Sequence, residues 1–380
     1  MDSSDRMPRI HIINSEKIKG WYRKHSLFIN LIGLIIFLYL FFFSLELMGS
    51  SLKMFGREFA KSLIQTTSNP IVGLFIGILS TSIIQSSSST TSIVVGMVAG
   101  GVLETSSAIP IIMGANIGTS VTNTLASLPQ INRSSEFSRA FSAAIVHDFF
   151  NVLAVLVLFP IQIGTDFLGR TATFLGEAFQ HIGGLTFLSP VKALTSPLVK
   201  LLIKHMGIHP WILFVASLLL LLFSLKGMVG ALKALVVEKA EMWFDTVLFK
   251  TALRAFLIGL MLTVVVQSSS ITTSLMVPMA GAGILALEQI FPYTVGANIG
   301  TTVTAILAAL VTGNLAAIVV AFSHLIFNIS GMIIWWPLKG VPIFLARRFS
   351  QYSIRSKIIP VGYILIVFLI VPLLGIYFLR

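Results

Sequence analysis

The sequence has no cysteine, which excludes disulfide bonds, thiolate nucleophiles and thiolate metal sites. Charged residues make up 11% of the 380 residues, whereas soluble domains carry about 25%. Only 14 Asp and Glu and 7 His are present, so few side chains are available for acid–base or metal chemistry. These shortages argue against a soluble protein and against an enzyme.

Hydrophobic residues, by contrast, account for 56% of the chain, and its mean hydropathy is +0.94. The formal net charge is +12, but the basic residues lie in short clusters between long apolar runs. Such clusters are typical of the cytoplasmic loops of membrane proteins, whereas a nucleic-acid-binding protein carries a continuous basic face. We therefore expect an all-α polytopic membrane protein that contacts the lipid bilayer and binds no nucleic acid.

Seven apolar runs are candidates for membrane-spanning helices, since a span needs about 20 apolar residues. The first run follows a basic segment, 1–26, and is longer than the core of about 7 to 15 residues in a secretory signal peptide. We therefore expect a retained helix preceded by a cytoplasmic N-terminal segment. The runs comprise residues 27–47, 105–128, 139–161, 210–225, 287–312, 315–337 and 358–379.

Two further apolar stretches, 70–101 and 252–283, are each interrupted near the centre by a polar run. Residues 85–92 read QSSSSTTS, and 182 positions later residues 267–274 read QSSSITTS. Backbone inside a bilayer must be helical unless it is buried in protein or lines a wet cavity. The paired interruptions therefore predict two re-entrant helical hairpins.

The similarity between the two polar runs extends over a longer part of the chain. Residues 85–128 share 23 of 44 positions with the segment that begins at Gln267, and both copies contain the element GANIGT. HDFFN at 147–151 also returns as HLIFN at 324–328. We expect two homologous halves, each with a re-entrant hairpin and a broken or Gly/Asn-interrupted helix. Repeat 1 comprises 27–161 with hairpin 70–101, and repeat 2 comprises 210–338 with hairpin 252–283.

Counting crossings predicts opposite orientations for the two halves. Each half crosses the membrane three times beside its hairpin, so the second half is inverted relative to the first. The basic segments 226–254 and 339–357 then lie in the cytoplasm. The linker 162–209 lies outside or at the membrane interface, and the final helix in 358–380 places the C-terminus outside. Inverted repeats with interrupted helices are typical of secondary transporters whose substrate binds at the midplane.

The polar interruptions predict the ligand site. Unpaired polar groups in a membrane cost several kcal/mol each, so a polar break implies that something binds there. Free N–H groups at the start of each second half-helix favour an anion, and hydroxyl oxygens also suit Na⁺. The alternative is that these hydroxyls only join packed helices. The candidate substrate ligands of the two runs are Gln85, Ser86, Ser87, Ser88, Ser89, Thr90, Ser268, Ser269, Ser270 and Thr272.

Asn116 and Asn298, in the two GANIGT elements, supply an amide in the middle of apolar runs. The flanking glycines also fit a small-xxx-small helix crossing, so a packing role is the alternative to substrate binding. We predict that both asparagines contact the substrate. Thr119, Thr122, Thr301 and Thr304 follow within about one turn and are candidate oxygen ligands for sodium.

Asp148 lies inside an apolar run and has no acidic counterpart in the second half, where Leu325 occupies its place. An ionisable residue inside a membrane indicates function by default, so Asp148 is a candidate sodium ligand. His147 and His324 fit better as hydrogen-bonded residues that pack helices together.

The segments 70–128 and 255–338 contain no Lys or Arg. A divalent anion bound between them would have no fixed positive partner, and burying two uncompensated charges is costly. Co-bound Na⁺ is therefore expected to neutralise the anion, because helix dipoles supply only about half a charge each. This argument applies to any divalent anion.

The paired QSSS runs, the GANIGT elements and the HDFFN and HLIFN sequences resemble the type II sodium-dependent phosphate cotransporter family, including its bacterial members. The resemblance covers residues 30–379. It implies symport of inorganic phosphate (HPO₄²⁻) with Na⁺ by alternating access, in a bacterial inner membrane, with no cofactor. It also implies sodium contacts at Thr124, Gln130, Asn151, Gln267, Thr301 and Thr304. The full predicted sodium-binding set is Gln85, Thr119, Thr122, Thr124, Gln130, Asp148, Asn151, Gln267, Thr301, Thr304 and Asn328.

The chain departs from the animal members of that family at two positions. Arg133 stands where they have Asp, and Ala297 stands where they have Ser, so the ligands of one sodium site stay open. In the family, an acid at the place of Asp148 marks electrogenic members. The pattern here is Ser142, Ala144 and Asp148, in which Ser142 matches the electroneutral type and the acid matches the electrogenic type. We expect electrogenic transport.

Three alternatives remain from the sequence. A sodium-coupled transporter of sulfate or a dicarboxylate would use the same charge logic, although a dicarboxylate usually needs an arginine. An anion channel would need a continuous polar path instead of discrete clusters. An intramembrane serine hydrolase would need a single nucleophile, and the whole serine cluster is duplicated here. A homodimer is also left open.

Overall fold

The structure is a computed structural model, and it describes residues 10–181, 189–205, 208–240 and 249–380. Throughout these ranges the chain is helical, without strands. The first elements are α1 (Ile10–Met54), α2 (Gly56–Thr67), α3 (Pro70–Ile84), α4 (Ser87–Ala99), α5 (Thr105–Thr119), α6 (Val121–Ser127), the 3₁₀ turn η1 (Leu128–Gln130), α7 (Ser134–Thr165) and α8 (Phe167–His181). They are followed by α9 (Ser189–His205), α10 (Pro210–Ala240), α11 (Ala252–Val266), α12 (Ser269–Ser274), α13 (Met276–Gly281), α14 (Leu287–Thr312), α15 (Leu315–Trp335), α16 (Gly340–Ser353), α17 (Ile358–Leu365), the π-helical turn η3 (Ile366–Ile370) and α18 (Val371–Leu379).

Within the described ranges, six helices are long and apolar enough to cross a membrane, which agrees with an all-α polytopic membrane protein. They match six of the seven expected spans. The seventh, 105–128, is divided at Ser120 into α5 and α6. The six are Leu27–Met54, Ser134–Thr165, Pro210–Leu232, Leu287–Thr312, Leu315–Trp335 and Ile358–Leu379.

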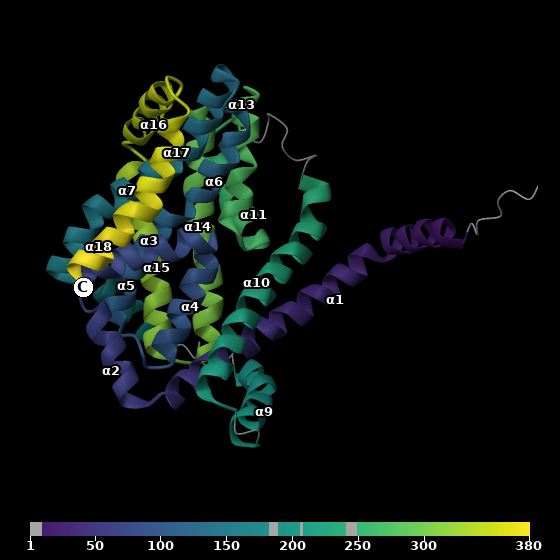
Figure 1. Cartoon of the computed structure of the whole chain (residues 1–380), viewed down its shortest axis with the longest axis vertical. Helices are drawn as coiled ribbons and strands as arrows, with labels where there is room; N and C mark the ends of the chain where they lie inside the picture. Colours follow the sequence, from purple (N-terminus) through teal and green to yellow (C-terminus); the bar gives the residue numbers. More distant parts are fainter. Residues whose placement is uncertain (1–9, 182–188, 206–207, 241–248) are drawn as a thin grey trace, which may run out of the picture.

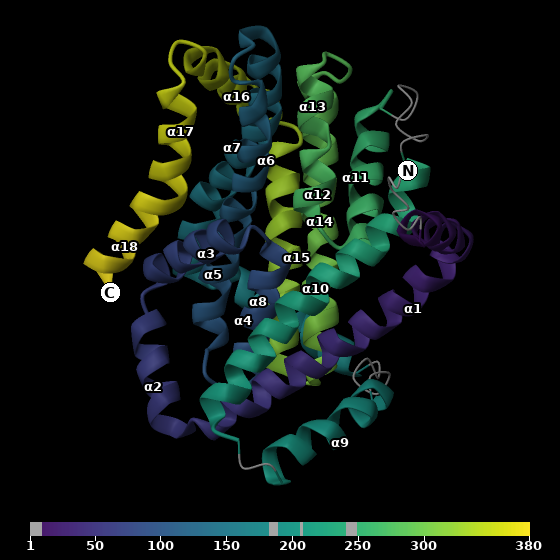
Figure 2. The same cartoon turned by 45° about the vertical axis from the view of Figure 1, so that its right-hand side comes forward.

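Long helices α1 and α10 pack along each other and run obliquely across one side of the helix bundle (Figure 1). Figure 2 shows the same pair in front of α4, α8 and α15, with α9 below them. The tripeptide FSL occurs in both helices, at 43–45 in α1 and at 223–225 in α10. The two helices enclose one side of the region where the two hairpins meet.

The two polar interruptions have the same local structure. Gln85 and Gln267 end α3 and α11 in the left-handed region, each at φ 58°, which non-glycine residues seldom adopt. Ser86 and Ser268 are then extended and cap the following helices, accepting hydrogen bonds from the N–H groups of Ser89 and Ile271 at 3.2 and 3.4 Å. Both interruptions are therefore sharp breaks between two helices.

Close packing of the hairpins also repeats with the 182-residue offset. A Cβ added at Gly77 in α3 would lie 1.9 Å from the carbonyl oxygen of Ile111 in α5. A Cβ added at Gly259 in α11 would lie 2.0 Å from the carbonyl oxygen of Tyr293 in α14. These glycines let the backbones approach directly, as small residues do in membrane helix pairs.

Replacing Gly77 with alanine is expected to lower the free energy of unfolding by about 1–3 kcal/mol, because α3 and α5 must separate to admit the methyl group. Thermal unfolding of the purified protein in detergent measures this as a lower Tm. The matched control is Gly164→Ala in α7, where the added Cβ meets no atom within 4 Å. Equal Tm values for the two variants would contradict the tight α3–α5 contact.

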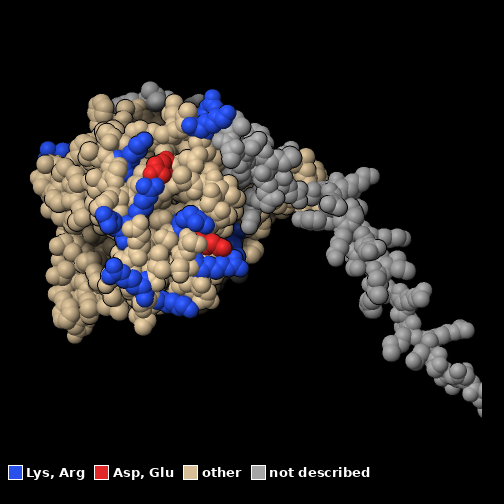
Figure 3. Space-filling view, turned by 90° about the horizontal axis from the view of Figure 1, so that it is seen from above, with Lys and Arg blue, Asp and Glu red and all other residues tan. Residues whose placement is uncertain are grey.

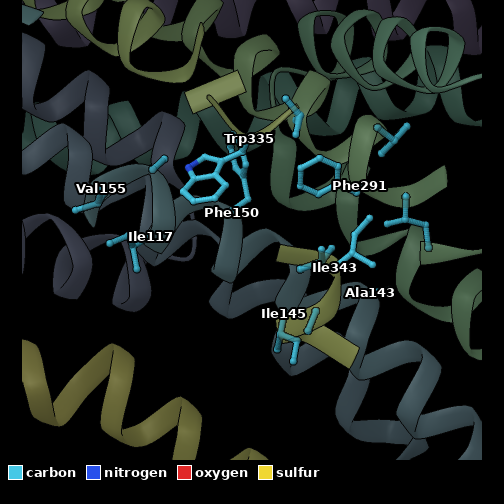
Figure 4. Packing of buried hydrophobic residues seen from close by; sticks show 14 of the residues in the cluster. Ile117, Ala143, Ile145, Phe150, Val155, Phe291, Trp335 and Ile343 are labelled. Atoms are coloured by element: carbon cyan, nitrogen blue, oxygen red, sulfur yellow. The ribbon is translucent and has the colours of Figure 1, made fainter. Parts of the chain in front are cut away.

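A hydrophobic core joins elements from both halves. Phe150 of α7 and Phe291 of α14 pack edge to face, with ring centroids 5.9 Å apart and an interplanar angle of 76°. Figure 4 shows both rings beside Trp335, with Ile343 of α16 in the same cluster. Burial of these side chains holds α7, α14, α15 and α16 together.

The basic segment 339–357 lies at one end of the molecule. Helix α16 occupies most of it, because Pro342, Ile343 and Ala346 share one face and bury it. Seen from above, Lys and Arg side chains gather on this end (Figure 3). Arg347 pairs with Glu288 at 2.6 Å, and Arg348 is exposed.

Helices also occupy the described parts of the N-terminal segment and the linker. Helix α1 begins at Ile10, so the segment 1–26 is helical throughout its described part. The linker 162–209 contains α8 and α9 in its described residues. A broken or Gly/Asn-interrupted helix was expected in both halves, but only the first has a break. It lies at Ser120, two residues after the second glycine of GANIG. The equivalent helix α14 runs without interruption from Leu287 to Thr312. The hydroxyl of Ser120 bonds the Ile117 carbonyl at 2.7 Å and also contacts Asp148, which favours the break there.

Candidate functional site

The two hairpin breaks face each other. The Ser88 hydroxyl donates to the Gln267 carbonyl oxygen at 3.3 Å, and the Ser270 hydroxyl donates to the Gln85 carbonyl oxygen at 3.4 Å. Figure 2 shows α4 toward the lower end of the molecule and α13 toward the upper end, so these two helices lie on opposite sides of this contact. The reciprocal bonds place both polar runs at one place between the halves.

A cavity of about 550 Å³ lies beside this contact. Its wall combines polar groups from the two breaks and from α6 with apolar residues of α10. The polar lining residues are Gln85, Ser86, Ser88, Ser89, Thr122, Gln267, Ser268, Ser270, Ser274 and Lys226. Six members of the predicted substrate set therefore line one opening: Gln85, Ser86, Ser88, Ser89, Ser268 and Ser270.

The other hydroxyls of the two runs are buried behind the cavity wall. Thr90 donates to the Ser86 carbonyl oxygen at 3.2 Å. Thr272 lies 2.8 Å from the Thr263 hydroxyl, and Ser269 is 2% exposed. Ser87 is also buried. In this arrangement these residues stabilise the helix starts, while their neighbours face the opening.

Asn298 and Asn151 belong to a buried hydrogen-bond network between the halves. Asn298 donates from Nδ2 to Asn151 Oδ1 at 2.7 Å, and its Oδ1 lies 2.8 Å from His147 Nε2. Asn123 Nδ2 lies 3.2 Å from His147 Nδ1, and Thr273 donates to Asn123 Oδ1 at 3.0 Å. These partners assign the imidazole proton to Nε2. The expected hydrogen-bonded packing role of His147 is confirmed.

The equivalent residues of the other half make the mirror contact. His324 Nε2 lies 3.4 Å from Asn116 Oδ1, while Asn116 donates to the Ile112 carbonyl oxygen at 2.9 Å. Asn151 Nδ2 donates to the Asn116 carbonyl oxygen at 2.7 Å. Both GANIGT asparagines are thus engaged inside the protein and do not line the cavity, so substrate contact by either stays a prediction.

Asp148 occupies a second polar cluster, formed by α5–α7 and α17. The carboxylate is 1% exposed and accepts hydrogen bonds from Ser120, from Thr124 at 3.4 Å and from Tyr363 at 3.2 Å. No Lys, Arg or His forms an ion pair with it among the residues that the structure describes. Four oxygen-bearing side chains therefore meet without a positive charge, which is a suitable arrangement for Na⁺.

Several of the remaining candidate sodium ligands have a free oxygen. Gln267 Oε1 accepts from Thr304 of α14 at 2.6 Å, so α14 contacts the second break. Thr119 and Thr301 donate to the carbonyl oxygens four residues before them, at 2.9 and 3.0 Å. Buried oxygens without a hydrogen-bond partner in the described part of the chain occur on Thr122, Gln130 and Asn328.

The predicted sodium set does not converge on one point. Thr122 and Gln267 line the cavity, and Thr124 joins Asp148. Gln130, at the end of η1, lies instead beside the end of α13. Its Cγ is 4.0 Å from the place that a Cβ on Gly281 would occupy. Arg133, which replaces the acid of animal members, is exposed and pairs with Glu136 at 3.1 Å. The candidates thus divide between the breaks, the Asp148 cluster and the end of η1.

Sequence reasoning missed two residues at these sites. Lys226 of α10 lines the cavity from within a candidate membrane span, although the sequence pattern placed it in the cytoplasmic segment 226–254. It also corrects the expectation that an anion there has no fixed positive partner, because the segments without Lys or Arg exclude α10. Tyr363 of α17 contacts Asp148, and the available signal for it was a polar side chain within an apolar helix.

Known proteins resemble this chain over most of its length. The chain matches the model of the Na+/Pi-cotransporter family over residues 40–188 and 220–347. It is 33% identical to human sodium-dependent phosphate transport protein 2B over 443 aligned positions, covering 90% of this chain and 64% of that protein. It is 34% identical to rat sodium-dependent phosphate transport protein 2A over 416 positions, covering 88% of this chain and 65% of the relative.

The chain therefore spans slightly less than two thirds of the length of these relatives. No solved structure shows a significant match. The family match extends over both polar runs, both GANIGT elements and the residues around Asp148. On this evidence the chain belongs to the Na+/Pi-cotransporter family.

Proposed function

We propose that this protein imports inorganic phosphate together with Na⁺. The observation that carries the proposal is the cavity of about 550 Å³ between the two QSSS breaks, lined by hydroxyl and amide groups from both halves. Its size and its many O–H donors suit a small tetrahedral oxyanion. The relatives are sodium-dependent phosphate transport proteins by name, and this chain has the polar runs that form the cavity.

The substrate ligands in this proposal are the residues that line the cavity or support its wall. Ser88 and Ser270 each use a weak bond of 3.3–3.4 Å to the opposite break, so their hydroxyls are available to turn toward an anion. The first turn of α4 adds N–H groups, whose partial positive charge favours an anion. Asn116 and Asn298 would reach the anion only after the halves rearrange.

Sodium ions would bind where oxygen atoms gather without a cation. The Asp148 cluster is one such place, and Gln267 with Thr304 and Thr122 is another. Each bound Na⁺ offsets negative charge of the phosphate, so binding of the two substrates is mutually favourable. The ion at Asp148 would make the net charge of the transported ions positive and transport electrogenic.

Alternating access follows from the proposed arrangement of two inverted repeats, 27–161 and 210–338. The 182-residue offset between Gln85 and Gln267, and between the Gly77 and Gly259 contacts, supports a common origin of the halves. Movement of one half against the other would open the cavity to each side in turn. The segments 162–209 and 339–357 would connect the moving parts.

We also propose a location in a bacterial inner membrane. The end of the molecule that carries α16 is rich in Lys and Arg (Figure 3), and positive charge favours the cytoplasmic side. The N-terminus would then be cytoplasmic and the C-terminus extracytoplasmic. A homodimer is compatible with this location.

The experiment that tests the proposal is uptake of radiolabelled phosphate into proteoliposomes. Uptake is expected to rise with Na⁺ with a Hill coefficient above one, because more than one cation is needed to offset a divalent anion. Replacing external Na⁺ with choline or K⁺ should reduce uptake to the level of protein-free liposomes. Persistent uptake in choline would refute sodium coupling.

Competition in the same assay identifies the anion. Excess unlabelled phosphate should abolish uptake of labelled phosphate, whereas sulfate or succinate at the same concentration should leave that uptake nearly unchanged. Sodium-driven uptake of labelled sulfate or succinate in place of phosphate would assign the cavity to that anion. Single-channel currents in planar bilayers would instead indicate an anion channel.

A further inference from the structure

Lys226 is the only charged side chain among the described residues that line the cavity between the breaks. It lies in α10, within an apolar stretch that is a candidate membrane span. Leu222, Leu225 and Val229 of the same helix also line the cavity. One face of α10 therefore closes the opening, and that face places an ammonium group opposite the hydroxyls of both breaks.

The ammonium group has no ionic or hydrogen-bonding partner among the residues that the structure describes. Neither of the two ion pairs in those ranges involves Lys226, and no hydrogen bond from a described residue reaches it. Its side chain is exposed toward the opening rather than buried. A lysine inside an apolar span is costly unless it meets water or a negative charge, so its position needs an explanation.

The equivalent position in the first half has the opposite charge and a different environment. FSL at 43–45 aligns with FSL at 223–225, so Glu46 of α1 corresponds to Lys226. Glu46 accepts hydrogen bonds from Thr195 and Ser196 of α9 and does not line the cavity. The charge at 46 is thus satisfied by α9, whereas the charge at 226 faces the cavity.

We propose that Lys226 is a specificity-determining residue that draws a divalent tetrahedral oxyanion into the cavity and offsets part of its charge. This inference rests on the proposed function. An ammonium group attracts a dianion more strongly than a monoanion, so the residue favours HPO₄²⁻ over H₂PO₄⁻. It repels Na⁺, which is consistent with the location of the anionic Asp148 cluster away from the cavity lining. The Na⁺ at Asp148 thereby binds away from the anion, whereas a Na⁺ at Gln267 and Thr122 would share the cavity with it.

The first test compares phosphate kinetics of three variants in proteoliposomes. Lys226→Gln is expected to raise the KM for phosphate about tenfold with Vmax changed less than twofold, because attraction of the anion is lost while the hydroxyls remain. Lys226→Arg should keep the KM within about twofold. Lys250→Gln removes one exposed positive charge away from the cavity and is the matched control.

A merely structural role for Lys226 would give a different result. Loss of packing would lower Vmax and Tm of Lys226→Gln and would leave the phosphate KM near the wild-type value. If the wild type shows sodium-driven uptake and Lys226→Gln has the same phosphate KM, the inference is overturned and the proposed function stays intact.

The absence of cysteine permits a second test that needs no transport. Lys226→Cys introduces a single thiol, which reacts with methanethiosulfonate reagents that add an ethylammonium or an ethylsulfonate group. Phosphate with Na⁺ is expected to slow this labelling several-fold, whereas labelling of Lys250→Cys should not change. A labelling rate at Lys226→Cys that ignores phosphate overturns the inference.

The charge of the added group provides the functional readout. In a transporting protein, the ethylammonium group should restore a low phosphate KM to Lys226→Cys, and the ethylsulfonate group should raise the KM further. Equal effects of the two reagents would also overturn the inference. If the wild type shows no sodium-driven phosphate uptake, the proposed function fails, and protection of the thiol by phosphate still decides whether Lys226 binds an anion.

Discussion

Replacing Asn298 with leucine is expected to reduce phosphate uptake about 100-fold. Leucine is similar in size, but it leaves the Nε2–H of His147 and Oδ1 of Asn151 without their partners at 2.8 and 2.7 Å. Each unsatisfied buried group costs about 1–3 kcal/mol, and about 3 kcal/mol corresponds to about 100-fold in an equilibrium. Tm in detergent should fall as well. Initial rates of radiolabelled uptake and thermal unfolding measure the two effects.

A double-mutant cycle separates the network from the individual residues. Asn151→Leu removes the other end of the same bond, so the double variant should cost at least about 1 kcal/mol less than the sum of the single variants. Asn132→Leu, at an exposed asparagine before α7, is the control and should have little effect. Strictly additive costs would show that the two asparagines do not act as one unit.

The internal repeat made much of the fold predictable. Two copies of the QSSS run at a fixed offset located both helix breaks, and in the structure Gln85 and Gln267 share the same left-handed φ. Hydropathy located the long helices, because a run of about 20 apolar residues has few alternatives to a membrane helix. These features depend on short stretches of sequence, where the pattern itself contains the information.

Contacts between the halves could not be predicted in the same way. The bond from Asn298 to Asn151 joins residues 147 positions apart, and a repeat indicates only which residues are equivalent, not which are opposed. Lys226 was assigned to a cytoplasmic segment because further lysines follow it in the sequence, whereas its relation to the cavity depends on how α10 crosses the two breaks. The two GANIGT elements also diverge, since Ser120 breaks the first helix and Thr302, with a similar bond to the Ile299 carbonyl oxygen at 2.7 Å, does not break α14.

Asp148 illustrates what the structure adds to a residue that the sequence already indicated. The sequence marked an unmatched acid inside a span, but not its partners. The structure surrounds the carboxylate with the hydroxyls of Ser120, Thr124 and Tyr363. Tyr363 comes from α17, outside both repeats, so the final helix connects to the Asp148 cluster.

Asp148→Gly is expected to abolish the electric current that accompanies phosphate uptake, while some sodium-driven uptake remains. Removing the carboxylate removes the ligand for one Na⁺, so the net charge of the transported ions changes from positive to zero. One charge moved through the membrane potential corresponds to about 2.3 kcal/mol per 100 mV. Wild-type uptake should therefore accelerate when K⁺ and valinomycin impose a negative interior, and uptake by Asp148→Gly should not.

Asp166→Gly is the matched control, because it also exchanges an acid for glycine. Asp166 is exposed at the end of α7 with φ 51°, a conformation that glycine adopts without strain. Its uptake should keep the wild-type response to valinomycin. Wild-type uptake that ignores the imposed potential would mean that Asp148 serves only as a hydrogen-bond acceptor joining α7 to α17, since three hydroxyl donors already satisfy the carboxylate without a cation.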